Sequence, residues 1–334
     1  MVKKRNSLLE LYRILFCFWV LYFHHFFFFK NTEKIYREAY LAVEFFFILA
    51  GVFLLNTLKK TDDLPFWKAC GRVLWGRLKP LVCTLAVVFC FNVTGIIIDA
   101  CKYGFDFERQ IGTVYYLWFL PFLFFGVFVM FLLYRLIKNK CLYLLLLIIL
   151  AIAGYCVEFG VEFGYDWADQ LPLSIARSLG GFSLGILVSC IPRLQLQWKK
   201  INFHYFFLPI IIALIACLAY DPRSAWGRGG IILLYAALIY FTLGTNCSCK
   251  VFDFLGSLSM RMYIYMAILC MLILFGVTHH RILFFIDLGL ALTDMFVFKY
   301  GSNMSRQKIQ YGCSHFLLIY KPKFLRLTEC RQVL

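Results

Sequence analysis

Apolar runs of about twenty residues follow one another along almost the whole chain, separated by short polar segments. A hydrocarbon core of about 30 Å needs about 20 apolar residues for each helical crossing. A helix also satisfies every backbone hydrogen bond within its own run, which lipid requires. Apolar residues make up 62% of the 334 residues and charged residues only 16%, which excludes an ordinary soluble domain. The sequence therefore predicts an all-α, polytopic integral membrane protein.

About ten runs are predicted to cross the membrane. They cover residues 8–29, 40–58, 80–98, 114–136, 141–157, 171–191, 203–219, 230–243, 257–277 and 282–298. The first run follows basic residues as a signal peptide does, but its length and its lack of a small-residue cleavage site predict a retained helix. We expect one transmembrane domain over residues 1–298, followed by a polar and basic cytoplasmic tail over residues 299–334.

The charges of the connecting loops predict the orientation of these helices. Basic residues gather in alternate segments: Lys3, Lys4 and Arg5; Lys59, Lys60, Lys68, Arg72, Arg77 and Lys79; Arg135, Lys138 and Lys140; Arg193, Lys199 and Lys200. The other segments hold most of the acids: Asp99, Asp106, Glu108, Glu158, Glu162, Asp166 and Asp169. Because cytoplasmic loops carry the excess of Lys and Arg, both termini are predicted to be cytoplasmic. The net charge of +16 reports orientation, and no nucleic-acid partner is expected.

The 14 cysteines show no spacing typical of a disulfide framework. Cys247 and Cys249 form one close pair, but a single pair without a second pair or a nearby His is weak evidence for zinc. We expect neither a metal site nor a tightly bound cofactor.

Ionisable residues inside a crossing are costly, and they therefore indicate a functional site. In the first run, Arg13 and His24 are 11 residues apart, which returns to within about 20° of the same helix face. Their separation along the axis is about 16 Å, which places Arg13 near the cytoplasmic side and His24 in the outer half. Glu10 lies one turn before Arg13.

Glu44 lies in the second run, which returns from the outside, and is predicted at a depth similar to that of His24. A carboxylate there orients the imidazole and stabilises its protonated form, as a general base acting on a hydroxyl requires. In the alternative interpretation Arg13 pairs with Glu10 or reaches the interface, while His24 and Glu44 lie among outer headgroups. The compatible faces and depths of the three groups favour the functional interpretation.

Two further polar groups have one functional and one structural interpretation each. Arg72 and Arg77 precede the third run, where arginines suit the phosphates of a donor but also anchor a cytoplasmic loop. Ser259 and Tyr263 share one face of the ninth run, with Arg261 between them. Ordinary hydrogen bonding between helices is the alternative for this second group.

The motifs formed by these residues resemble those of the membrane acyltransferase 3 family, whose members O-acylate cell-surface and secreted glycans. The matching segments are Glu10-Leu-Tyr-Arg13 with His24, Val43 to Gly51, Arg77 to Pro80, Trp118 to Leu120, Gly181 to Gly185, and Leu255 to Tyr263. They occur in the expected order over residues 1–277. Ala50 and Met266 depart from the family pattern, in which Ser and His are usual.

The resemblance implies an O-acyltransferase in the cell membrane of a bacterium. It would move an acyl group, expected to be acetyl, from cytoplasmic acyl-CoA to a hydroxyl of an extracytoplasmic or lipid-linked glycan. The implied catalytic residues are His24, which activates the hydroxyl or carries the acyl group, and Glu44, which orients it. The implied donor- or substrate-binding residues are Glu10, Arg13, Arg72, Arg77, Ser259, Arg261 and Tyr263.

A transporter or flippase that uses the same intramembrane charges is the alternative. It is disfavoured because the sequence shows no obvious repeated half, and because the charges concentrate in the first, second and ninth runs. Acyl groups from acyl-CoA that appear on a glycan would identify the enzyme, whereas a glycan that only changes sides would identify the transporter.

Overall fold

A computed structural model describes residues 6–27, 41–104, 117–160, 167–192, 210–216, 224–245, 247–274 and 285–297. Within these ranges the regular secondary structure is helical and no strand occurs, which confirms the all-α prediction. The predicted tail over residues 299–334 lies outside the described residues.

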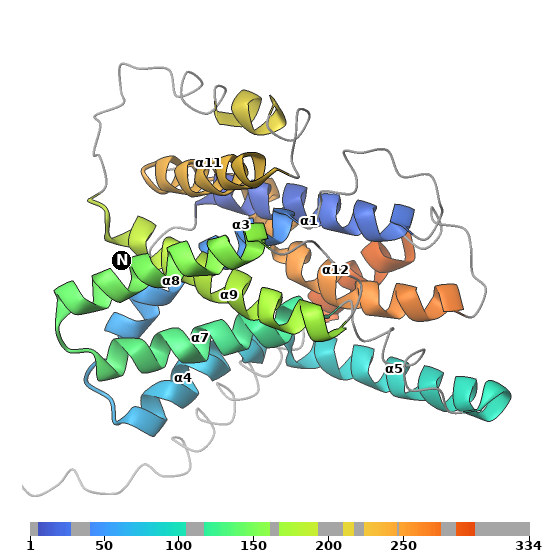
Figure 1. The fold of residues 1–334 in the computed structure, drawn as a ribbon. Coiled ribbons are helices and arrows are strands. Elements are labelled where there is room, and N and C mark those ends of the chain that lie inside the picture. Colours follow the sequence, from blue (N-terminus) through green and yellow to red (C-terminus); the bar gives the residue numbers. More distant parts are fainter. Residues whose placement is uncertain are drawn as a thin grey trace, which may run out of the picture.

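The helices follow the predicted runs closely (Figure 1). They are α1 (Ser7–Phe27), α3 (Ala42–Lys59), α4 (Phe66–Leu78), the short 3-10 helix η2 (Lys79–Leu81), α5 (Val82–Tyr103), α7 (Phe119–Leu136), α8 (Lys140–Gly160), α9 (Trp167–Cys190), α11 (Ala225–Leu243) and α12 (Lys250–Leu274). Residues 210–216 and 285–297 are helical as well. Helical residues therefore overlap each of the ten predicted crossings.

Six segments of the described chain are long and apolar enough to span a membrane: 42–59, 66–103, 119–136, 140–160, 171–190 and 226–243. The prediction of a helical membrane protein is confirmed to this extent. The larger number of about ten crossings and the cytoplasmic placement of both termini stay predictions.

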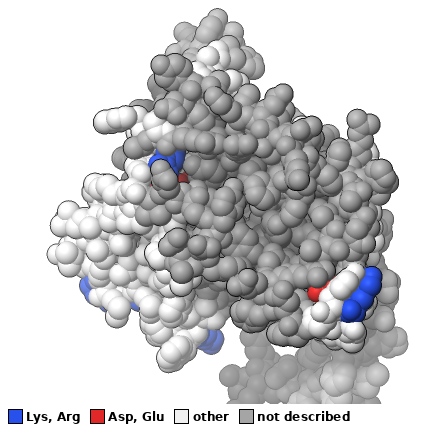
Figure 2. Space-filling view, turned by 45° about the vertical axis from the view of Figure 1, so that its right-hand side comes forward, with Lys and Arg blue, Asp and Glu red and all other residues white. Residues whose placement is uncertain are grey.

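Helix α3 lies at the centre of the molecule and α5 at its edge (Figure 1). Two thirds of the residues of α3 are buried, because it is apolar on all sides and is enclosed by α1, α7, α9 and α11. In contrast, Phe89, Ile97 and other large apolar side chains of α5 are exposed, as expected of a helix that faces lipid. The described surface visible in Figure 2 is largely uncharged, with Lys and Arg at only a few places.

Glycines allow α3 and α9 to approach at backbone distance. A Cβ atom on Gly185 would collide with the carbonyl group of Ile48, and one on Gly51 would collide with the carbonyl of Phe182. Helices in lipid associate through such small residues, because close backbone approach supplies the packing energy that hydrophobic burial cannot. The two glycine-containing motifs seen in the sequence therefore meet each other in the fold.

Helix α4 occupies a segment that the sequence suggests only as a basic loop. It buries Ala69, Cys70 and Val73 on one face, while Trp67 and Arg72 on the other are exposed. The segment is helical because its apolar residues recur at three- and four-residue intervals. The arginines before the third run are thus held on a helix that continues through η2 into α5.

The start of α1 is fastened to the connection between α11 and α12. The Asn6 amide donates to the carbonyls of Thr242 (2.6 Å) and Thr245 (2.8 Å), and the backbone N–H of Cys249 donates to the Ser7 hydroxyl (2.7 Å). These bonds hold the start of α1, the end of α11 and the start of α12 close together. The predicted topology places all three on the same side of the membrane.

Candidate functional site

A pocket lies where α1, α3, α7 and α12 meet. Its lining consists of Arg13, Cys17 and Val20 from α1, Val43 and Phe46 from α3, Phe119 from α7, and Ser259, Met260 and Tyr263 from α12. Its empty volume, which includes its open side, is about 370 Å³. The fold therefore brings Arg13 together with Ser259 and Tyr263, three predicted site residues from opposite ends of the sequence.

Arg13 supplies the positive charge of this pocket. Its Nη1 donates to Glu10 Oε2 over 2.7 Å, and both side chains are largely buried. Glu10 is packed against Gly256 of α12, where any side chain would collide with it. The structural interpretation of the Arg13–Glu10 pair is confirmed, but the pair also holds the guanidinium at the pocket wall. A guanidinium has five N–H donors, so this bond leaves capacity for an anionic ligand.

Cys17 and Ser259 join the two helices that form one side of the pocket. The Cys17 thiol donates to the backbone carbonyl of Ser259 over 3.0 Å, and the Ser259 hydroxyl donates to the carbonyl of Gly256 over 2.8 Å. Cys17 and Ser259 thus line the pocket, and both also form hydrogen bonds within or between α1 and α12. No sequence pattern distinguishes Cys17, because it is a single cysteine within an apolar run.

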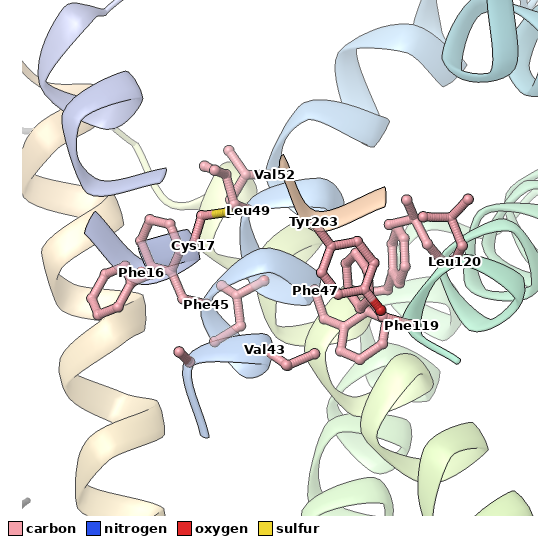
Figure 3. Packing of buried hydrophobic residues seen from close by; sticks show 14 of the residues in the cluster. Phe16, Cys17, Val43, Phe45, Phe47, Leu49, Val52, Phe119, Leu120 and Tyr263 are labelled. Carbon is pink, nitrogen blue, oxygen red and sulfur yellow. The ribbon is translucent and has the colours of Figure 1, made fainter. Parts of the chain in front are cut away.

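Aromatic rings from α3, α7 and α12 also line the pocket, namely those of Phe46, Phe119 and Tyr263. The ring centroid of Phe119 lies 4.7 Å from that of Phe47, 5.6 Å from that of Tyr263 and 6.2 Å from that of Phe46. In Figure 3 Phe47, Phe119 and Tyr263 gather on one side of α3, while Phe16, Cys17 and Phe45 lie on the other. The pocket is therefore apolar over most of its surface and cationic at Arg13.

Arg261 belongs to a bridge between helices. Its Nε lies 3.0 Å from Asp294 Oδ2, and the Thr84 hydroxyl of α5 donates to the same oxygen over 2.6 Å. Arg261 is absent from the pocket lining, as are Arg72, which is exposed on α4, and Arg77, which is half-buried there. The binding roles of these three arginines stay predictions.

His24 lies near the end of α1 and is half-buried. The position of Glu44 along α1 can be judged from the next residue, Phe45. The ring centroid of Phe45 lies 4.4 Å from that of Phe16 in α1. His24 is eight residues beyond Phe16, or about 12 Å along the helix. The start of α3 thus packs beside the middle of α1, and the pairing of His24 with Glu44 stays a prediction.

The observed ionic partner of Glu44 is Arg177 of α9, which is not among the predicted site residues. Arg177 Nε lies 2.5 Å from Glu44 Oε1, and both side chains are almost completely buried. The Arg177 guanidinium also lies 5.1 Å from the Trp118 ring centre. An arginine within an apolar run meets the criterion that singled out Arg13, so the sequence did contain this signal.

Glu158 is a second carboxylate near Arg177. The acids of the outer segments are predicted to lie in loops, but Glu158 is inside α8 and Asp99 is inside α5, and both are buried. Glu158 Oε1 lies 3.8 Å from Arg177 Nε. The prediction was wrong for these two acids because hydropathy ends a run at the first charged residue, whereas the helix continues past it.

We call Glu44, Tyr155, Glu158, Arg177 and Tyr235 the Arg177 cluster. Its members come from α3, α8, α9 and α11, and all are buried. No group of three or more His, Cys, Asp or Glu residues placed to hold a metal ion occurs among the described residues. The cluster is thus an ionic and phenolic site in the interior of the helical bundle.

Comparison with models of protein families gives a match to the acyltransferase 3 model, an acyltransferase domain, over residues 6–300. The match extends past residue 277, so it includes the helix at 285–297 that the sequence motifs did not reach. Searches of curated proteins and of solved structures give no match. The matched region contains the helices, the pocket and the Arg177 cluster. The chain therefore belongs to the acyltransferase 3 family, as a membrane acyltransferase.

Proposed function

We propose that the protein transfers an acyl group, in the first instance acetyl, from cytoplasmic acyl-CoA to a hydroxyl of an extracytoplasmic or lipid-linked glycan. The observation that supports this proposal best is the pocket, in which one cation, Arg13, is part of a mostly apolar lining. A thioester with a short apolar acyl chain and a more distant anionic group has complementary chemistry.

The composition of the pocket suits one end of this donor, because its lining is mostly apolar and contains one cation. The acyl-thioester arm would lie against the apolar lining, with the nucleotide phosphates on the side of Arg13. We assign the phosphates to Arg13, Arg72 and Arg77, because arginine forms bidentate bonds with phosphate. The remaining donor- or substrate-binding assignments are Glu10, Ser259, Arg261 and Tyr263.

The proposed reaction uses His24 as a general base. It takes the proton of the acceptor hydroxyl, whose oxygen attacks the thioester carbonyl carbon. The new C–O bond forms as the C–S bond breaks, and the thiolate of CoA leaves and is protonated. Glu44 remains the second catalytic candidate. Transfer across the bilayer requires donor and acceptor to meet between the pocket and the His24 end of α1.

The proposal is tested in cells that express the wild-type protein or His24→Ala at equal membrane levels. Acetyl groups labelled on acetyl-CoA should appear in surface glycans only with the wild type, as measured by mass spectrometry. Full labelling with His24→Ala would reject the assigned base. Movement of unlabelled glycan to the other side of the membrane, without any acylation, would instead identify a flippase.

A further inference from the structure

The Arg177 cluster contains several buried oxygen atoms without a hydrogen-bond partner in the described part of the chain. They are Glu44 Oε2, both carboxylate oxygens of Glu158 and the hydroxyl of Tyr235. The Tyr155 hydroxyl lies near Glu44 but also lacks a hydrogen bond of normal geometry. Buried polar groups are nearly always hydrogen-bonded, so this concentration at one place requires an explanation.

The charges of the cluster do not balance either. Two carboxylates share one guanidinium, and Arg177 Nε is close to Glu44 at 2.5 Å but distant from Glu158 at 3.8 Å. Another cation from a packed helix is Arg228 of α11, whose guanidinium donates to the backbone carbonyls of Glu158 and Phe159. The carboxylate of Glu158 is therefore a strong acceptor that receives no hydrogen bond from these neighbours.

The cluster and the pocket draw on adjacent residues of the chain. Val43 and Phe119 line the pocket, while the residues next to them in the chain, Glu44 and Trp118, contact Arg177. Phe119 and Tyr263, visible in Figure 3, line the pocket, whereas Phe47 lies on the same face of α3 as Glu44 and packs against Phe182 of α9. The cluster and the pocket thus use different faces of α3.

We propose that the Arg177 cluster is a subsite for the hydroxyl groups of a sugar acceptor. Hydroxyl groups would donate to Glu158 and to the second oxygen of Glu44, and would accept from the tyrosines. Trp118 beside Arg177 offers the flat apolar surface that a sugar ring can cover. This inference rests on the proposed function and extends it, because it assigns the acceptor to residues that the pocket does not contain.

Entry to the subsite would be from the end of α8 that carries Glu158. Glu158 is two residues from the last residue of α8, at the side predicted to be extracytoplasmic. Arg228 fastens this end to α11 through its two bonds to backbone carbonyls, and the cluster is closed in this structure. Separation of these two helix ends would open the site to an acceptor outside the membrane.

The experiment uses the full-length protein in lipid nanodiscs, with the methyl glycosides of glucose, galactose and N-acetylglucosamine as probes. Glu158→Gln and Tyr155→Phe preserve side-chain shape and remove the proposed contacts. At least one glycoside should raise the Tm of the wild type without acyl-CoA and leave that of Glu158→Gln unchanged. In acetyl transfer, both variants should raise the KM for this glycoside at least tenfold, with the KM for acetyl-CoA changed less than twofold.

Tyr143→Phe is the matched control, because Tyr143 is also buried in α8 with a hydroxyl that has no hydrogen-bond partner, but lies at the other end of the helix. It should behave as the wild type in both measurements. Equal Tm shifts in the wild type and Glu158→Gln, or no shift in any protein, would overturn the subsite and indicate enclosed water instead. If glycosides stabilise the wild type selectively but no acyl group is ever transferred, the proposed function fails and the subsite stands.

Discussion

Arg177 Nε lies 2.5 Å from Glu44 Oε1, with both side chains buried between α9 and α3. Breaking such a pair by the removal of one partner costs about 3–5 kcal/mol, because an uncompensated charge stays buried. Replacement of both partners by neutral groups of similar shape costs less, since neither charge is then left alone.

We therefore expect Arg177→Met to lower the free energy of unfolding by about 3–5 kcal/mol. The double variant Arg177→Met with Glu44→Gln should recover a substantial part of this loss. Unfolding of the purified proteins in detergent, followed by circular dichroism, measures both values. Strictly additive losses would show that the two side chains do not depend on each other.

Arg13→Ala should weaken binding of the donor. Loss of a hydrogen bond to a charged group costs about 1.5–3 kcal/mol, which corresponds to an increase of about 10- to 150-fold in the KM for acetyl-CoA. Lys102→Ala, at an exposed cation near the end of α5, is the control and should leave this KM unchanged. An unchanged KM in Arg13→Ala would contradict the assignment of the donor phosphates to Arg13.

Val43→Ala should widen the range of acyl groups accepted, because Val43 lines the pocket and the change removes two methyl groups. One methylene in an apolar pocket changes discrimination by about 1–3 kcal/mol. The ratio of kcat/KM for butyryl-CoA to that for acetyl-CoA should rise at least tenfold. Val52→Ala, which truncates a buried valine of the same helix outside the pocket lining, should not change the ratio. A change in both variants would point to general loosening of α3.

Gly185→Ala should destabilise the protein by about 1–3 kcal/mol, because the added methyl group would collide with the carbonyl of Ile48 and push α3 from α9. Gly71→Ala is a matched change on α4, where an added Cβ would meet no atom within 4 Å. It should be neutral or stabilising by up to about 1 kcal/mol, since alanine favours helices. In thermal unfolding, Gly185→Ala should therefore lower the Tm, whereas Gly71→Ala should leave it unchanged or raise it. Equal stability of the two would contradict the close contact.

The sequence predicts the helices well because the apolar composition of each run is enough to indicate a helix there. It predicts Arg13, Ser259 and Tyr263 as site residues, but their meeting in one pocket depends on the packing of α1 against α12, which no local pattern specifies. Arg177 meets the same criterion as Arg13, because both are arginines within an apolar run. Glu158 is predicted in a loop because hydropathy marks the residue at which a run turns polar. Hydropathy does not show that a charged residue has a buried ionic partner on another helix.

The packing of the helices divides the described part of the molecule into two bodies. Helices α3, α7 and α8 pack against α9, with backbone contact at Gly51 and Gly185, whereas α1 and α5 pack against α12. The pocket takes two of its walls from each body, α3 and α7 from the first and α1 and α12 from the second. It consequently lies at the boundary between these two groups of helices, so a change in their relative angle would change its width.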